Sequence, residues 1–436
     1  MMTNHFIHDI LSLAENKIPD NIFNCARTVL VDYLGVRKAG MRIIGAQCEC
    51  LINELGDTIA TKALTSGICS HVIELDDGHR IGMVHSGAPV ISALLAVAEK
   101  YPVSSKDLLR GIIIGYEVAI RLACAVQPSH KLKFYHATGT CGTVGAAMGI
   151  ATMLKFDFEQ MKSAFSAATT SAAGILEMID GDTQMKPFNA GRAAMDGVTA
   201  AFIGKTRFKS PDDALGGKRG FLKVMTDEPK LQYITDFSIG KYMIESIYQK
   251  SYAACRHCHP GIEAALKIRE KRGFDINRIE HIQVDTYKLA VEGHDHTRIN
   301  SVNAAKMSIP YSIAVALYWG KAGMDEFSEK RISDSEVLKI TEKVKVSIKD
   351  ELSVLCPQKR AAIVKVRTSE GNFEERVDYP KGEPENPLSK EELEEKFRSL
   401  AMYGGLTTEE CDAIIGEVWK ESFSLERIIT ICNKHW

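Results

Sequence analysis

Apolar residues in the first half of the chain recur at the spacing of one helical face. Between residues 19 and 35 they follow the i, i+4, i+7, i+8 pattern, at Ile22, Phe23, Ala26, Val29, Leu30, Tyr33 and Leu34. Asp20 or Asn21 can cap this predicted helix, and Gly35 can end it. The same pattern predicts helices over residues 88–99, 105–125, 142–154, 158–177 and 191–204. Because several are rich in Ala, Gly, Ser and Thr, we expect a bundle of closely approaching helices.

The pattern changes after about residue 245, where short alternating segments begin. Residues 343–349 alternate strictly between polar and apolar side chains, as in a strand with one solvated face, and residues 282–287 predict a second strand. Segments 363–368 and 373–379 flank a turn-forming Ser-Glu-Gly-Asn sequence and predict a hairpin. Helices are predicted over residues 260–272, 304–319 and 334–343. The second region therefore has the pattern of an α+β domain.

Two capping boxes predict a return to helix near the C-terminus. Ser389 stands three residues before Glu392, and Thr407 stands three residues before Glu410. Prolines at positions 380, 384 and 387 mark the preceding segment as a connection. Local sequence leaves open whether these last helices join the first region or the second.

The charge balance argues against two classes of partner. The chain has 54 basic and 56 acidic side chains and a net charge of −2, whereas nucleic-acid binders and membrane-surface proteins usually carry clustered basic residues. Residues 134–154 lack a formal charge, but their Gly, Thr, Ala and His content makes a poor lipid-facing surface. We therefore predict that the protein binds neither nucleic acid nor membrane.

The length of 436 residues indicates two or three domains. The eleven cysteines are an odd number scattered along the chain, which fits free thiols better than a disulfide framework. The first residues lack the basic, apolar and small-residue pattern of a secretory signal. These features predict a cytoplasmic protein.

Histidines and acids gather in one short window before the apolar run 89–98. The window contains His71, His79 and His85 together with Glu74, Asp76 and Asp77. A carboxylate beside an imidazole orients its tautomer and raises its basicity, as proton abstraction requires. The alternative is a capping loop with solvated Asp and His side chains.

A metal site is another interpretation of the histidine-rich segments. The segments 255–259 (Cys-Arg-His-Cys-His) and 294–296 (His-Asp-His) offer ligands, but neither has the paired spacing of a zinc framework, and Arg256 disfavours a cation. We therefore predict no bound metal. The sequence also lacks a G-x-G-x-x-G dinucleotide motif and a G-x-S-x-G nucleophile elbow.

Two cation-containing stretches stand near predicted helix starts. Lys186 and Arg192 lie around one loop-to-helix junction, and Lys250 and Arg256 precede another predicted helix. Cations there oppose the helix macrodipole, so an anionic ligand, particularly a carboxylate, is a plausible partner. The alternative is that these are ordinary exposed cations.

A series of motifs follows in collinear order over about residues 15–320, namely ELDDGHR, VHSGAPVISALLAVAE, GYEVAIRLA, FYHATGTCGTVGAA, KPFNAGRAAMDGVTAA, GGKRGFL, KSYAACRHCHPGIEAAL and AAKMSIPYSIAVAL. This series resembles the MmgE/PrpD family, which includes 2-methylcitrate dehydratases, cis-aconitate decarboxylases and iminodisuccinate epimerases. The resemblance implies a mainly α fold with an α+β second domain. The large helical domain would comprise residues 1–245 and 390–436, and the smaller α+β lid domain residues 246–389. A homodimer without organic cofactor or metal is also implied.

The resemblance further implies roles for individual residues. Those that match family site positions are Glu74, Asp76, Asp77, His85, His136, Thr138, Thr140, Lys186, Lys250 and Tyr311. We also assign Arg192, Arg256 and His259 to substrate binding. Two departures from the family pattern lie in this region. HSGA replaces the commoner HPG or HPSG, and Glu74 stands where many members have Asp.

The expected function is a cofactor-independent lyase that dehydrates a small hydroxy-polycarboxylate such as 2-methylcitrate. A cationic pocket would stabilise the carbanion-like centre that forms next to a carboxylate. We expect Lys186, Lys250 and Arg192 to hold substrate carboxylates while His85, oriented by Asp76 or Asp77, transfers a proton. Tyr311 or His136 would protonate a leaving hydroxyl or return a proton to carbon. The remaining substrate-binding assignments are Glu74, Thr138, Thr140, Arg256 and His259.

Other functions stay open at this point. Within the same family, the alternatives are a cis-aconitate-type decarboxylase and an iminodisuccinate-type epimerase, because the same groups can serve each reaction. From other classes, the alternatives are a catalytically silent polycarboxylate-binding protein and a metallohydrolase.

Overall fold

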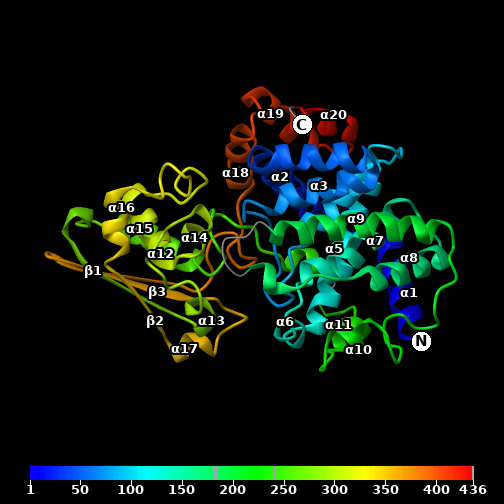
Figure 1. The fold of residues 1–436 in the computed structure, drawn as a ribbon, viewed down its shortest axis with the longest axis horizontal. Helices are drawn as coiled ribbons and strands as arrows, with labels where there is room; N and C mark the ends of the chain where they lie inside the picture. The colour runs from blue at the N-terminus through cyan, green and yellow to red at the C-terminus, as the bar shows by residue number, and fades with distance from the viewer. Residues whose placement is uncertain (180–184, 240–241, 435–436) are drawn as a thin grey trace. The chain divides into compact units, whose positions relative to one another are not determined.

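The computed structural model describes residues 1–179, 185–239 and 242–434, and it divides into two compact units. One unit consists of Met1–Tyr248 and Ser389–Trp436, and the other of Gln249–Leu388. The first is helical, and the second combines helices with a four-stranded sheet (Figure 1). The predicted fold class, mainly α with an α+β portion, is confirmed.

The first unit is a bundle of helices. Its elements are α1 (Met2–Glu15), α2 (Asp20–Leu55), α3 (Ile59–His71), α4 (Gly87–Ala98), α5 (Ser105–Val126), α6 (Ser129–Leu132), α7 (Ala137–Met153), α8 (Phe158–Ser171), η1 (Leu176–Ile179), α9 (Met185–Lys205), α10 (Phe221–Met225), α11 (Gln232–Thr235), η2 (Met243–Ser246), α18 (Lys390–Tyr403), α19 (Thr408–Val418) and α20 (Leu425–Cys432). Every helix predicted in this region is present, although several ends differ.

Several predicted helix ends were wrong, and α7 and α9 begin five and six residues before their predicted starts at 142 and 191. Helix α2 continues through Gly35 to Leu55, because Gly35 is a packing position where a Cβ would lie 3.1 Å from Phe397 of α18. The helix predicted over 158–177 ends at Ser171, because the following segment pairs with the chain before α7. There the amide of His136 donates to Gly174, and the amide of Leu176 donates to Phe134.

Helices α5 and α7 form the centre of the bundle and pack directly on each other. Their close approach depends on glycine, since a Cβ on Gly145 would lie 2.6 Å from Cβ of Ala119 and 2.6 Å from the carbonyl oxygen of Gly115. Helices α3 and α9 meet similarly, because a Cβ on Gly191 would fall 2.3 Å from the carbonyl oxygen of Leu64. Such contacts leave no room for a side chain, as expected from the small-residue composition.

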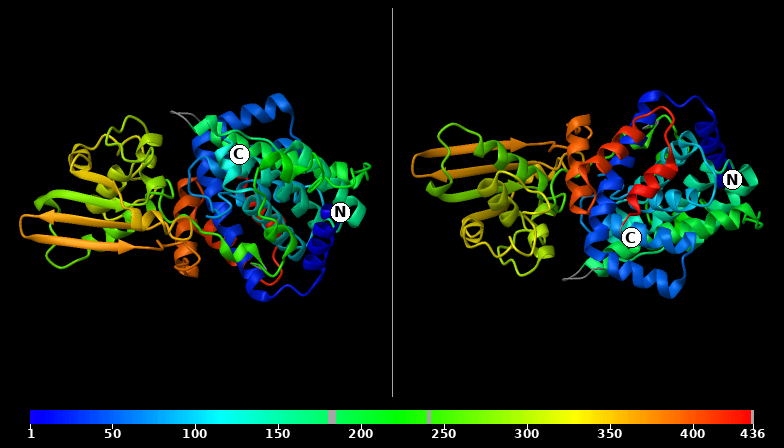
Figure 2. Two further views of the ribbon diagram at one scale, coloured as in Figure 1. Left: turned by 90° about the horizontal axis from the view of Figure 1, so that it is seen from below. Right: turned by 90° about the horizontal axis from the view of Figure 1, so that it is seen from above.

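The C-terminal helices belong to the helical unit, with α18 packed along α2 (Figure 2). Lys396 of α18 forms a 2.5 Å ion pair with the buried Asp32 of α2 and also donates to the carbonyl of Leu75 at 3.0 Å. Both predicted capping boxes are confirmed, at Ser389 and Thr407. The last helices thereby support the loop that follows α3.

The second unit is built around a mixed sheet of strand order β2-β1-β3-β4. Strands β1 and β2 are parallel, and the other two pairings are antiparallel. Helix α12 packs on β3 and β4, and α15 packs on β2. The elements are α12 (His259–Arg269), η3 (Ile276–Arg278), β1 (Ile279–Thr286), α13 (Lys288–Val291), α14 (Val302–Met307), α15 (Ile309–Trp319), α16 (Ser335–Thr341), β2 (Val344–Ile348), α17 (Asp350–Ser353), β3 (Ala362–Thr368) and β4 (Gly371–Val377).

The strand predictions for this unit are confirmed, including the β3–β4 hairpin, whose strands appear as adjacent orange arrows in Figure 2. The apolar positions of β2 are not all buried. Val344 is buried, whereas Ile348 is 48% exposed, because β2 lies at the edge of the sheet. The helix predicted over 304–319 is two helices, since Ser308 caps α15 and Pro310 occupies its first turn. In the described part of the chain, no helix is long and apolar enough to cross a membrane.

We predict that Gly145→Ala destabilises the first unit by about 1–3 kcal/mol, because the new methyl group overpacks the α5–α7 crossing. Urea unfolding followed by circular dichroism measures the change. The matched control is Gly45→Ala on α2, where a Cβ meets no atom within 4 Å and helix propensity favours alanine. Equal stability of the two variants would contradict the packing argument.

Candidate active site

The acid and histidine window forms a buried loop between α3 and α4. Asp76 and Asp77 are 5% and 4% exposed, and His71 at the end of α3 is fully buried. The loop is held by paired hydrogen bonds between Gly78 and Tyr248 and by a bond from the amide of His79 to Val84. The interpretation of this window as a solvated capping loop is therefore wrong.

The carboxylate of Asp76 lies between two imidazoles. Its Oδ2 is 2.6 Å from Nδ1 of His71 and 3.3 Å from Nδ1 of His85. Burial by itself would raise the pKa of Asp76, but the two imidazoles hold it well below its usual range. Asp76 is therefore a buried carboxylate that stays ionised between the two rings.

The hydrogen bonds of His85 define which ring nitrogen is basic. Nδ1 lies 2.6 Å from the backbone carbonyl of Asp77, and a carbonyl oxygen can only accept a hydrogen bond. Nδ1 therefore carries the proton in the neutral ring, and Nε2 is the basic atom. Thr138 of α7 fixes the backbone at this point, because its hydroxyl accepts from the amide of His85 at 3.1 Å.

Asp77 uses its side chain for a different purpose. Its carboxylate accepts from the hydroxyl of Tyr116 at 2.6 Å and from the amide of Gly87, at the start of α4, at 3.1 Å. Burial raises the pKa of Asp77 to about 7, despite the opposing effect of the Tyr116 hydrogen bond. Of the two acids expected to orient His85, Asp76 faces it through its carboxylate and Asp77 through its backbone carbonyl.

A third imidazole, His136, stands at the start of α7. Its ring centroid lies 6.1 Å from that of His71, and Nδ2 of Asn189 approaches its Nδ1 at 3.4 Å. Burial, with the neighbouring charges of His71, Lys186 and His85, holds the pKa of His136 well below its usual range. A neutral ring of this kind can accept or donate a hydrogen bond at physiological pH without carrying charge.

Lys186, in the first turn of α9, forms an ion pair with Glu74 of the loop. Both side chains are partly exposed, at 24% and 15%. Glu74 has a left-handed backbone, with φ of 60°, which costs free energy in a residue with a side chain. The ion pair thus joins α9 to the acid-imidazole loop and puts one cation beside it.

Two predictions for the first unit need correction or refinement. Arg192 does not lie at a helix start, because α9 begins at Met185 and places Arg192 inside the helix. It pairs with Asp196 at 3.0 Å and donates to the carbonyl of Ala173. Thr140 supports a neighbouring ring, since its hydroxyl lies 2.8 Å from Nε2 of His130.

The remaining predicted residues belong to the second unit. Lys250 is 2% exposed, Nε of Arg256 lies 2.7 Å from Oε1 of Glu383, and Nε2 of His259 lies 3.2 Å from the carbonyl of Ala254. Tyr311 is fully buried, and its hydroxyl donates to the carbonyl of Glu326 at 3.1 Å. Burial raises the pKa of the Tyr311 hydroxyl above its usual value. Its surroundings are those of a core tyrosine.

Sequence reasoning gave no role to three residues that complete the cluster. They are His71, which shares Asp76 with His85, Tyr116, which holds Asp77, and Asn189, which contacts His136. A signal existed for His71, because it stands within the same acidic window. Tyr116 and Asn189 come from α5 and α9, and nothing in their local sequence links them to the loop.

The same cluster provides the ligand atoms of a candidate metal site. Those of His71, Asp76 and His85 all lie within 4.8 Å of one another. However, the 2.6 Å separation between His71 Nδ1 and Asp76 Oδ2 is a hydrogen-bond length. Ligands bound at about 2.0–2.1 Å around one ion stand farther apart, at about 3 Å or more. The geometry fits a proton-sharing cluster better than a metal centre.

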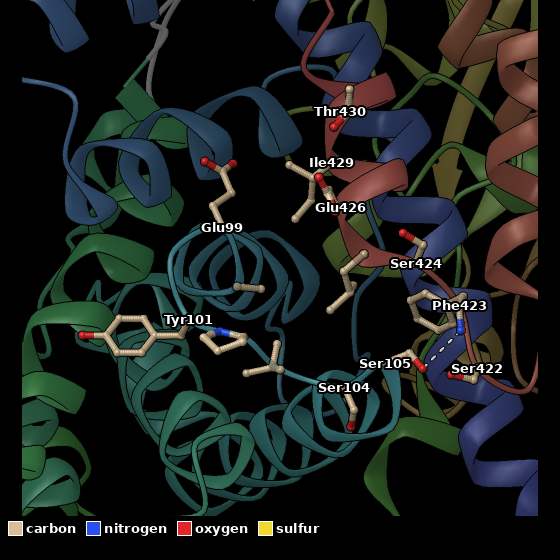
Figure 3. Close-up of a pocket in the computed structure, with 14 residues that line it drawn as sticks. Glu99, Tyr101, Ser104, Ser105, Ser422, Phe423, Ser424, Glu426, Ile429 and Thr430 are labelled. Carbon is tan, nitrogen blue, oxygen red and sulfur yellow. Dashed lines mark hydrogen bonds between the residues drawn. The ribbon is translucent and has the colours of Figure 1, made fainter.

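A separate pocket of about 510 Å³ lies elsewhere in the first unit (Figure 3). Its lining includes Glu99, Tyr101, Ser105, Phe423 and Glu426, and the amide of Phe423 donates to Ser105 at 3.3 Å. The lining contains none of the predicted site residues, and its two glutamates would repel a polycarboxylate. It is therefore not the candidate active site.

Comparison with protein families gives two matches that together span most of the chain. Residues 44–234 match the model described as the MmgE/PrpD N-terminal domain. Residues 252–421 match the model of the MmgE/PrpD C-terminal domain.

Curated relatives include enzymes named for decarboxylation. The chain is 26% identical over 370 residues to the cis-aconitate decarboxylase-like protein oryM of Aspergillus oryzae, covering 78% of this chain and 75% of that protein. It is 24% identical over 438 residues to human cis-aconitate decarboxylase (92% and 88% covered) and 23% identical over 426 residues to the mouse enzyme (92% and 86%).

The raised pKa of Asp77 predicts a specific pH dependence of stability. Folding favours the protonated form, so the contribution of Asp77 to the free energy of unfolding falls as pH rises from its unfolded value near 4 to about 7. Asp77→Asn removes this titration. The stability of the unmodified protein relative to Asp77→Asn should decline across that window, by at most about 1.4 kcal/mol per pH unit.

Urea unfolding of both proteins at pH 5, 6, 7 and 8 measures this difference. A stability difference that is constant with pH, or that grows as pH rises, would contradict the assignment of a protonated, buried Asp77.

Proposed function

This chain belongs to the MmgE/PrpD family, and on that premise we propose that it is a lyase acting on a small polycarboxylate by proton transfer at a carbon next to a carboxylate. The observation that carries the proposal is the buried, ionised Asp76 shared by two imidazoles. Such a group raises the basicity of a neighbouring ring, which is what removal of a weakly acidic C–H proton requires.

The proposed base is Nε2 of His85. As it takes the proton, the ring becomes an imidazolium whose charge is stabilised by Asp76, and the electron pair stays on the substrate carbon. The adjacent carboxylate delocalises this pair as an enediolate. Lys186 is the cation of the cluster positioned to stabilise that charge, with a substrate carboxylate competing against Glu74 for it.

His136 is proposed as the group that donates a hydrogen bond or returns a proton. Its ring is neutral, so it can give up a proton only while taking one from elsewhere, and His71 is the nearest imidazole with which to share one. Thr138 and Asn189 would act as positioning residues. Thr138 accepts a hydrogen bond from the amide of His85, and Asn189 contacts the ring of His136. Roles for Lys250, Arg256, His259 and Tyr311 stay predictions.

Three reactions can follow from the same kind of carbanion-like centre. In dehydration, which the sequence analysis favoured, the C–H electrons form the double bond as the β-hydroxyl leaves with a proton. In decarboxylation, the breaking bond is C–C, CO₂ departs, and the carbon takes a proton. The names of the relatives favour a cis-aconitate-like acid and decarboxylation as the second candidate. Epimerisation would return the proton to the opposite face.

Proton NMR in deuterated water distinguishes these reactions in one experiment. The purified protein is incubated with methylcitrate, citrate, cis-aconitate and iminodisuccinate, each with and without a chelator. New alkene signals from methylcitrate or citrate indicate dehydration. Replacement of the cis-aconitate signals by those of an acid with one carboxylate fewer indicates decarboxylation, and interconversion of diastereomers indicates epimerisation. We expect turnover of at least one substrate that the chelator leaves unchanged. No turnover and no deuterium incorporation with any of them would contradict the proposal.

We predict that His85→Gln lowers kcat by about 10²–10⁴-fold on the substrate so identified, because a glutamine cannot act as a general base. KM should change much less, since Lys186 remains. The matched control is His5→Gln, a substitution of the same type at an exposed position on α1, which should keep full turnover. Turnover above a tenth of normal in a correctly folded His85→Gln protein would exclude His85 as the base.

The homodimer implied by the family resemblance is part of the proposal. Light scattering coupled to size-exclusion chromatography measures the mass in solution directly. A monomeric mass with full lyase activity would show that one chain is sufficient.

A further inference from the structure

The second unit contains a cysteine–histidine pair that the proposed reaction does not use. Sγ of Cys255 lies 3.3 Å from Nε2 of His294, and Nδ1 of His294 donates to the carbonyl of Glu292 at 2.9 Å. Because a carbonyl can only accept, Nδ1 carries the proton of the neutral ring, and Nε2 is the base that faces the thiol. This order of thiol, base and orienting group is the arrangement of an activated nucleophile.

The charges and hydrogen bonds around Cys255 favour its thiolate form. Burial by itself would raise the pKa of Cys255, but the charge and hydrogen bond of His294, the backbone N–H of His257 and the charge of Lys250 lower it to about 7. The neighbouring Cys258 is affected in the opposite sense, since burial and the nearby Cys255 raise its pKa. The thiol pKa values of the two cysteines in this Cys-Arg-His-Cys segment are therefore shifted in opposite directions.

The other ionisable groups around the pair already have partners. Nδ1 of His257 lies 2.6 Å from the hydroxyl of Tyr287, and its ring centroid is 5.0 Å from that of His294. Arg256 is paired with Glu383. His294 is thus the titratable side chain in hydrogen-bond contact with the sulfur, while Lys250 acts at longer range.

Accessibility separates Cys255 from most of the other cysteines. Cys255 is partly exposed, whereas Cys48, Cys69, Cys124, Cys141, Cys258, Cys411 and Cys432 are buried. Soft electrophiles react with the thiolate, not the thiol, and need a path to the sulfur. Cys255 combines a lowered thiol pKa with partial exposure of the residue.

We propose that Cys255, activated by His294, is a nucleophilic thiol that soft carbon electrophiles modify selectively. In the reaction with a haloacetamide, the thiolate sulfur forms a C–S bond, the carbon–halogen bond breaks, and the halide leaves with its electron pair. Cys255 and His294 both belong to the second unit, and their proposed reaction does not depend on the lyase chemistry.

The test is the rate of alkylation by iodoacetamide at each cysteine, measured by peptide mass spectrometry on the full-length protein between pH 5.5 and 9.5. For Cys255 we expect the rate to rise with a midpoint near pH 7. The internal reference is Cys50, an exposed cysteine of α2, whose rate gives the response of simple exposure.

His294→Gln should change the alkylation rate of Cys255 in opposite directions at the two ends of the pH range. Without the imidazole charge, the midpoint should move toward that of an ordinary thiol, about 8.5. The rate at pH 7 should fall about threefold, because fewer thiolates are present. At pH 9.5 it should rise about threefold or more, because a thiolate of higher pKa is the stronger nucleophile. Continued protection of the buried Cys258 from alkylation would show that this crossover does not come from a general loss of structure.

The matched control is His296→Gln, two residues along the same loop, where Nε2 contacts the carbonyl of Ala304 instead of the thiol. It should leave the midpoint for Cys255 near 7. The proposal is overturned if Cys255 titrates with a midpoint above 8 in the unmodified protein. It is equally overturned if His294→Gln and His296→Gln give the same profile.

Discussion

The candidate site depends on one electrostatic constraint, the burial of the Asp76 carboxylate. Removing such a charge from water costs several kcal/mol unless other groups replace the lost hydration. Two imidazoles do so here, at 2.6 and 3.3 Å from the same oxygen, and they keep the pKa of the acid low. In the proposed reaction, the same negative charge stabilises the imidazolium that forms when His85 takes a proton. Stability and the proposed chemistry therefore rest on the same interaction.

Much of the helical unit serves to hold this charge in place. Asp77 fixes the other side of the loop by accepting from Tyr116 of α5 and from the start of α4, and Lys396 of α18 holds the carbonyl of Leu75. These elements come together because glycines let α5, α7, α3 and α9 approach at backbone contact distance. A loop of this kind needs a rigid frame, since a small shift would leave a buried carboxylate without its partners.

The sequence predicted the fold class, most elements and the acid-imidazole window, because these depend on local periodicity and short spacings. It did not predict how the acids divide their roles. Asp76 and Asp77 are adjacent, yet one faces two imidazoles and the other faces Tyr116, a residue 39 positions away. It also placed Arg192 at a helix start, although α9 begins earlier and Arg192 pairs with Asp196. Such outcomes depend on packing between distant helices, which local sequence does not encode. The substrate-binding roles of the residues in the second unit remain predictions.

The central claim is that Asp76 and the Asp77 carbonyl fix His85 with its proton on Nδ1 and its basic lone pair on Nε2, beside a neutral His136. Nitrogen-15 NMR of the protein labelled only in its histidine rings measures this directly, with single His→Gln variants to assign the signals. The account predicts that, in its neutral form, the ring of His85 is the Nδ1-protonated tautomer, and that His136 stays neutral from pH 8 down to pH 6. A neutral His85 protonated on Nε2, or a His136 ring that becomes charged near pH 6.5, would contradict it.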